Sequence, residues 1–87
     1  MIITTTSNLQ GYDIVEYLGI AHGLGVNYNG TSGKVGEKML AKTWEEVNAS
    51  LESNAAAMGA DAVIGISYFQ EKSMCYVYGT AVKIKKV

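Results

Sequence analysis

The feature that most constrains this chain is one long helical stripe set between segments with a different period. Over residues 34–58 the apolar side chains recur at intervals of three and four, which is the spacing of one face of an α-helix. The stripe consists of Leu40, Trp44, Val47, Leu51, Ala55 and Met58. Gly59 follows, where a left-handed residue typically ends a helix. A single helix of this length can cover one face of one small sheet.

The segments on either side of the helix are rich in β-branched residues or alternate with a period of two. Strands are predicted at residues 2–6, 12–26, 61–70 and 74–85. The order β-β-α-β-β makes the fold class α+β, with one long helix packed on a mixed four-stranded sheet. We expect a parallel, right-handed crossover between the second and third strands and antiparallel hairpins at the other two connections. Residues 27–33 have the composition of a loop.

The composition indicates that this sheet needs a partner. The 87 residues form a single domain, 1–87, whose core alone is marginal. Of these residues 48% are hydrophobic and 17% are charged, against about a quarter charged in a typical domain. Both strand faces carry apolar or small side chains, and a monomer rarely leaves such a patch in water. We therefore expect a homo-oligomer in which another subunit covers the second face.

Charge and hydropathy exclude two classes of partner. The net charge is −1 and the seven basic residues are all lysines, so the chain lacks the basic field and the arginine forks that nucleic acids attract. No segment reaches the length of about 18 apolar residues that a membrane span requires. We read no signal peptide at the start of the sequence. A single cysteine without an export signal points to the cytoplasm.

The candidate metal ligands are the one histidine, His22, and the one cysteine, Cys75. One chain cannot build a Cys/His zinc site from them, but a symmetric ring repeats every residue near its axis. These residues leave the cofactor unknown; for a transition-metal ion, Asp13 and Glu16 are the harder alternative ligands. Because these two acids lie three apart in a strand, we expect them on opposite faces. Without a metal, His22 is a hydrogen-bonded strand residue and Cys75 a small buried hydrophobe.

Two further readings remain open. The segment 30–34 resembles a phosphate loop but lacks the first glycine and the Ser or Thr after Lys34. Lys34 and the loop amides are the candidates for an anion or small-molecule site at the helix N-terminus. The side chains of Tyr68, Tyr76 and Tyr78 could line a stacking surface. No Ser/His/Asp or Cys/His arrangement can be assembled, so we expect no enzyme, and a structural or protein-interaction oligomer is the third reading.

Three blocks of the chain carry a family resemblance. They are MIITTT with GYDIVEYLGI in residues 1–20, MGADAVIGI in residues 58–66 and YGTAV in residues 78–82. Together they resemble the YbjQ-like family, small bacterial and archaeal proteins of unknown function that are labelled as heavy-metal-binding. The resemblance implies a dodecin-like α+β unit assembled into a ring, commonly a pentamer, with a metal ion as the suggested ligand. Members usually carry a longer insertion before the long helix than residues 24–33 provide here.

The helical stripe makes Trp44 the largest apolar side chain that we expect in the core. Truncation of a buried aromatic residue costs about 3–5 kcal/mol, which is a large part of the stability of a small domain. Trp44→Ala should therefore lower the thermal unfolding midpoint by many degrees in a calorimetric scan. A shift below about two degrees would show that Trp44 is not a core residue.

Overall fold

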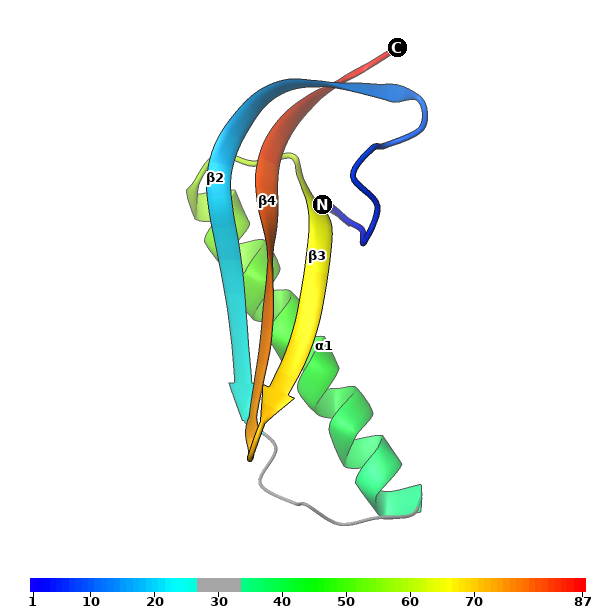
Figure 1. The fold of residues 1–87 in the computed structure, drawn as a ribbon, viewed down its shortest axis with the longest axis vertical. Coiled ribbons are helices and arrows are strands. Elements are labelled where there is room, and N and C mark those ends of the chain that lie inside the picture. The colour runs from blue at the N-terminus through cyan, green and yellow to red at the C-terminus, as the bar shows by residue number, and fades with distance from the viewer. Residues whose placement is uncertain (27–33) are drawn as a thin grey trace.

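The computed structural model describes the backbone of residues 1–26 and 34–87 and the side chains of residues 1–26 and 42–87. Its elements are β1 (Ile2–Ile3), β2 (Tyr12–Val26), α1 (Lys34–Ala57), β3 (Ala62–Glu71) and β4 (Met74–Lys86). The sheet has the order β1-β3-β4-β2, and α1 crosses one of its faces diagonally (Figure 1). The pair β1–β3 is parallel and the other two pairs are antiparallel. The predicted α+β fold with one helix on a mixed four-stranded sheet is thus confirmed, while the predicted loop at 27–33 lies outside the described residues.

One predicted connection is wrong and another is confirmed. The first two strands form no hairpin, because β1 pairs with β3 in parallel and ends at Ile3. Beyond Ile3 the threonines bond locally: the Thr6 N–H donates to Thr4 Oγ1 at 3.2 Å, and Thr6 Oγ1 donates to the Asn8 carbonyl at 2.7 Å. Such side-chain bonds compete with a strand ladder. The β3–β4 hairpin closes through a turn that contains Lys72 with φ 56°.

The strands that precede and follow the helix along the chain, β2 and β3, run parallel to each other but are not neighbours in the sheet. Both β2 and β3 pair antiparallel with β4, which lies between them. The helix that connects them ends as predicted, because Gly59 has φ 85°. The Ala60 N–H donates to the Ala55 carbonyl at 3.1 Å and the Gly59 N–H to the Ala56 carbonyl at 3.0 Å. These two bonds form a Schellman motif that satisfies the last carbonyls of α1.

The helix lies almost directly on the backbone of β2. A Cβ atom at Gly23 would stand 2.4 Å from the Val47 carbonyl oxygen and 2.9 Å from the Leu51 amide nitrogen, both in the helix backbone. A Cβ at Gly25 would stand 2.5 Å from a methyl group of Val47. Only glycine permits this approach. The main core lies at this contact and consists of Ala21, Val47, Leu51, Ala55, Val63, Ile66, Cys75, Val77 and Ala81.

A β-bulge in β3 changes which side chains face the helix. The register with β4 shifts between Ile64 and Ser67, and Gly65 within the bulge has φ 59°. As a result Val63 and Ile66 both join the core under the helix, although simple alternation places them on opposite faces. Beyond the bulge Tyr68 follows Ile66 to the helix side, where its ring meets Trp44.

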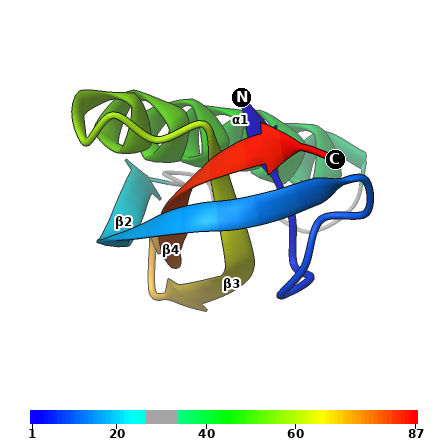
Figure 2. The same ribbon diagram turned by 90° about the horizontal axis from the view of Figure 1, so that it is seen from above.

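The start of β2 curls over the face of the sheet that α1 leaves uncovered (Figure 2). Register shifts between Ile14 and Glu16 and between Tyr17 and Gly19 accompany this curvature, as extra residues in one strand increase its bend. A second, smaller core forms beneath the curl. It consists of Ala62, Ile64 and Val82, packed against Leu9, Ile14 and Ile84. This cluster covers only the part of the sheet near the end of β4.

Trp44 lies at the margin of the main core. Its indole is half-buried and meets the Tyr68 ring edge-on, with ring centroids 5.0 Å apart. The Tyr68 hydroxyl donates to Asn48 Oδ1 at 2.8 Å. The helix therefore meets β3 through this aromatic contact and hydrogen bond at the margin of the core, in addition to the buried side chains of Val63 and Ile66.

The contact between α1 and β2 gives the first structural prediction. Gly23→Ala puts a methyl group against helix backbone atoms that cannot move alone, so we expect a loss of about 3 kcal/mol or more, at or above the usual cost of overpacking. Gly25→Ala is the comparison: its methyl group stands 2.5 Å from a Val47 methyl group but 3.3 Å from the nearest helix backbone atom, the Thr43 carbonyl oxygen, so its loss should be smaller. Urea unfolding at one fixed protein concentration measures both. Equal losses for the two variants would contradict the backbone contact.

Candidate functional site

The surface opposite α1 carries an exposed apolar patch, which we call the open face. It consists of Ile20, His22, Leu24, Ser67, Phe69, Tyr76 and Tyr78. Cross-strand pairing puts His22 opposite Tyr78 and Leu24 opposite Tyr76, and such partners share a face. Ile20 is 63% exposed, Leu24 50% and Phe69 48%. Large apolar side chains that are this exposed and adjacent mark an interaction surface.

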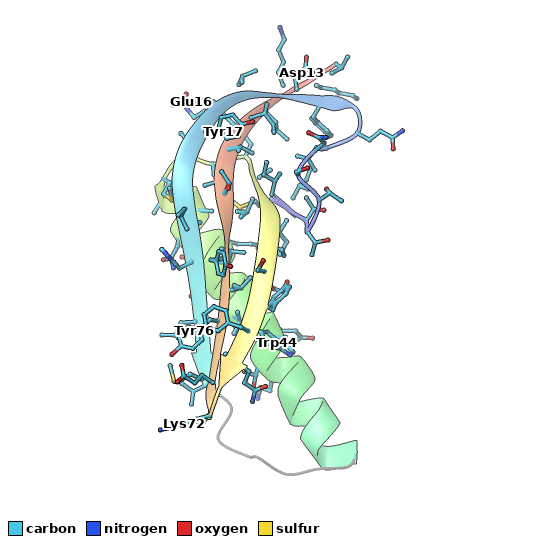
Figure 3. All side chains as sticks on the ribbon, viewed as in Figure 1. Asp13, Glu16, Tyr17, Trp44, Lys72 and Tyr76 are labelled. Atoms are coloured by element: carbon cyan, nitrogen blue, oxygen red, sulfur yellow. The ribbon has the colours of Figure 1, made fainter. Side chains whose placement is uncertain are left out.

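A hollow of about 310 Å³ lies within the open face. Its lining includes Ile20, His22, Phe69, Tyr76 and Tyr78. The Phe69 and Tyr76 rings are stacked with centroids 4.7 Å apart, and the Tyr78 ring lies edge-on to Phe69 at 6.1 Å. The aromatic wall is therefore held by its own ring contacts. Figure 3 shows Tyr76 low on β4, far from the curled end of β2 where Tyr17 lies.

The bulge at Gly65 explains which tyrosines share this surface. The predicted stacking set of Tyr68, Tyr76 and Tyr78 is wrong in one member, since Tyr68 lies on the helix side against Trp44. Phe69 takes its place beside Tyr76 and Tyr78. The one signal for this exchange in the sequence is Gly65 itself, a glycine inside a strand pattern.

The two predicted metal ligands lie on opposite faces of the sheet. His22 is exposed on the open face, where its cross-strand neighbour is Tyr78. Cys75 pairs with Gly25 and is fully buried in the core under the helix. One chain therefore does not bring His22 and Cys75 together.

The environment of Cys75 closes it to chemistry. Burial raises the pKa of the Cys75 thiol above its ordinary value, because desolvation disfavours the thiolate. The thiolate is the form that binds metals and attacks electrophiles. The folded chain thus holds Cys75 as a small packed side chain.

The two acidic candidates lie together at the curled end of β2 (Figure 3). Asp13 pairs with Lys85 and Glu16 with Lys83, so both carboxylates share a face with a lysine opposite each. The expectation that they lie on opposite faces is wrong, because the register shift between Ile14 and Glu16 changes the alternation. Opposite charges across a strand pair stabilise each other.

The described side chains of one chain gather no set of metal ligands. Among the residues whose side chains are described, no group of three or more His, Cys, Asp or Glu side chains gathers closely enough to hold a metal ion. The anion candidate, Lys34, is the first residue of α1, and its side chain lies outside the described part. Within the described residues, no helix is both long and apolar enough to cross a membrane.

Comparison with known proteins shows the family to which the chain belongs. A family model described as "Putative heavy-metal-binding" (YbjQ_1) matches residues 27–85. A UPF0145 protein of Halalkalibacterium halodurans is 34% identical over 105 aligned positions that cover 99% of this chain and 98% of the relative. A UPF0145 protein of Geobacillus kaustophilus is 36% identical, with 98% and 99% covered. The chain belongs to this YbjQ/UPF0145 family, whose function is unknown.

A solved structure supports the fold. The crystal structure of a protein of unknown function from Pediococcus pentosaceus, of the DUF74 family, matches with a TM-score of 0.73 and 21% identity over 98% of both chains. At this identity the likeness concerns the fold. The alignment with the Halalkalibacterium relative has 105 positions against 87 residues here, so that relative carries residues that this chain lacks.

The burial of Cys75 gives a reactivity prediction. Since its pKa is raised, a smaller share of the thiol is ionised than in a free cysteine at the same pH, and the reagent cannot reach the sulfur. We expect a disulfide reagent at pH 8 to modify the native protein very slowly and the urea-unfolded protein at the rate of a free thiol. Rapid native modification would show that Cys75 is accessible.

Proposed function

We propose that this chain is the protomer of a pentameric, dodecin-like ring that acts in the cytoplasm as a binding protein and not as an enzyme. The observation that carries the proposal is the open face, where large apolar side chains of β2, β3 and β4 are exposed side by side. Leaving this surface in water costs free energy that a second copy can recover. The buried state of Cys75 supports a role other than nucleophilic catalysis.

The surface area of the single chain supports self-association. It exposes 5655 Å², whereas a compact monomer of 9.3 kDa exposes about 5,000 Å². The chain thus exposes about 700 Å² more than a compact monomer of its mass. The radius of gyration is 14.3 Å, against about 12 Å for a compact chain of this length. This extended shape is consistent with the proposed self-association.

The proposed assembly is tested by a charge on the open face. Leu24→Lys puts an ammonium group among apolar neighbours that the proposal buries, so it should dissociate the oligomer. Gln10→Lys adds the same charge at an exposed position outside the open face and should leave the mass unchanged. Size exclusion with light scattering should give about five times 9.3 kDa for the wild type and the control. A wild-type monomer, or a Leu24→Lys variant of unchanged mass, would contradict the proposal.

Metal binding is the second candidate function, and His22 is the ligand that we propose for it. His22 is exposed on the face that we propose is shared between copies, so a ring would repeat its imidazole near one axis. Neutral imidazole is a ligand of zinc and copper. Cys75 has no part in this site, because it faces the other side of the sheet.

Titration calorimetry with zinc tests whether His22 or Cys75 binds the metal. We expect His22→Ala to weaken zinc binding at least about tenfold, a typical effect of disturbing a metal site, and Cys75→Ser to leave it unchanged. A matched loss in Cys75→Ser would require the buried thiol to be a ligand. Equal binding by the wild type and both variants would remove the metal role from this chain.

A further inference from the structure

The hollow of about 310 Å³ in the open face has a floor made of backbone. Gly23 and Val77 both line it and are partners across β2 and β4. Neither residue directs a side chain into it. The Val77 side chain is buried in the core under α1, and a Cβ at Gly23 would meet the Val47 carbonyl oxygen of the helix. The two main chains therefore form a flat floor between walls of side chains.

Aromatic rings form one wall of the hollow, and they hold one another in place. Phe69 and Tyr76 are cross-strand partners whose rings stack with an interplanar angle of 18°. The Tyr78 ring stands edge-on to Phe69 at 67°. Side chains that are already ordered lose little conformational freedom when a ligand binds, which lowers the cost of binding. The wall is therefore arranged in advance for another flat ring, which packs offset or edge-on against such rings.

The opposite wall combines an apolar side chain with hydrogen-bond donors. It consists of Ile20 and His22 of β2, and His22 lies directly across from Tyr78. Within the described part of the chain, neither the His22 imidazole nor the Tyr78 hydroxyl has a hydrogen-bond partner. A neutral imidazole carries one N–H donor and a tyrosine one O–H donor. Both groups are thus free to bind a polar atom at the edge of a ligand.

The charge and the size of the hollow restrict what it can hold. Among the described residues, no lysine and no carboxylate lines it. An ionised ligand would lose hydration there without gaining a counter-charge, whereas an uncharged ring gives up little. A volume of about 310 Å³ is at the lower end of the range of small-molecule sites, which is about 300–1,000 Å³. These properties favour a small uncharged ligand.

We propose that the hollow binds an uncharged planar aromatic molecule of one or two fused rings that carries a hydrogen-bond acceptor at its edge. The flat ring packs against the wall of Phe69, Tyr76 and Tyr78, and the acceptor receives a hydrogen bond from His22 or Tyr78. This inference rests on the proposed function as a binding protein and names its class of ligand. A second copy over the open face would close the hollow and exclude water from the ligand.

Coumarin is the probe, because it is an uncharged, flat molecule of two fused rings with a carbonyl acceptor. Octahydrocoumarin keeps the carbonyl group but is saturated, and coumarin-3-carboxylate adds a negative charge. In titration calorimetry with the full chain we expect a Kd below about 1 mM for coumarin. Each of the other two compounds should bind at least about fivefold more weakly. Equal affinity for octahydrocoumarin would overturn the aromatic class, and equal affinity for the carboxylate would overturn the uncharged one.

Two variants locate the binding. Phe69→Leu keeps an apolar side chain but removes one ring of the wall, so it should weaken coumarin binding about fivefold. Tyr17→Leu is the matched control, because it removes a ring that is 68% exposed on β2 but does not line the hollow. It should leave the affinity unchanged. Equal losses in the two variants would show that coumarin binds exposed apolar surface in general, and the inference would be wrong.

Nuclear magnetic resonance on the unmodified protein keeps the test decisive should Phe69→Leu not fold. Saturating coumarin should shift the amide signals of Gly23 and Val77, whose main chains form the floor of the hollow. The amide of Gly11, which lies before β2, should keep its position. Shifts of equal size at all three amides, or none at Gly23 and Val77, would overturn the inference.

Light scattering on the same samples separates a failure of this inference from a failure of the proposed function. A monomeric wild type overturns the proposed assembly, and coumarin binding to that monomer would still support the site. An oligomeric wild type that does not bind coumarin overturns only the ligand class. If coumarin binds the dissociated Leu24→Lys variant but not the oligomeric wild type, a neighbouring copy fills the hollow and the inference is wrong.

Discussion

The close contact between the backbones of α1 and β2 determines the rest of this structure. Glycine at positions 23 and 25 lets the helix axis lie against one strand, so the helix is displaced toward that side of the sheet. That position lets Ser50 and Asn54 reach the β2 edge. Towards the end of β3 the helix contact is made by half-buried Trp44 of α1 against the ring of Tyr68. Within the part of the chain that the structure describes, the opposite face is covered only where the curled start of β2 and Leu9 pack on it.

The consequence is a two-layer fold with one apolar surface that the single chain exposes to water. The curl of β2 covers the part of that surface over Ala62, Ile64 and Val82. The remainder, the open face, carries aromatic rings packed on one another around a hollow of about 310 Å³. We propose that a second copy of the chain covers this face.

The sequence predicts the elements well where the periodicity is long. The helix and β2 begin where predicted, and the β3–β4 hairpin follows from alternation on both sides of a short turn. The pairing of β1 could not be predicted, because two residues carry no period. The bulges at Gly65 and near Glu16 moved Tyr68 and Asp13 relative to their expected neighbours. The sequence could not show whether His22 and Cys75 share a face of the sheet. Their faces follow from the register of β2 with β4, which pairs Gly25 with Cys75.

The central claim is that the unmodified chain exists as several copies whose open faces are covered. Sedimentation equilibrium at micromolar concentration tests it most directly, since it measures mass without reference to shape. The account predicts a single species near five times 9.3 kDa that persists on dilution. A species of 9.3 kDa across the same range would contradict it, because the open face would then be stable in water.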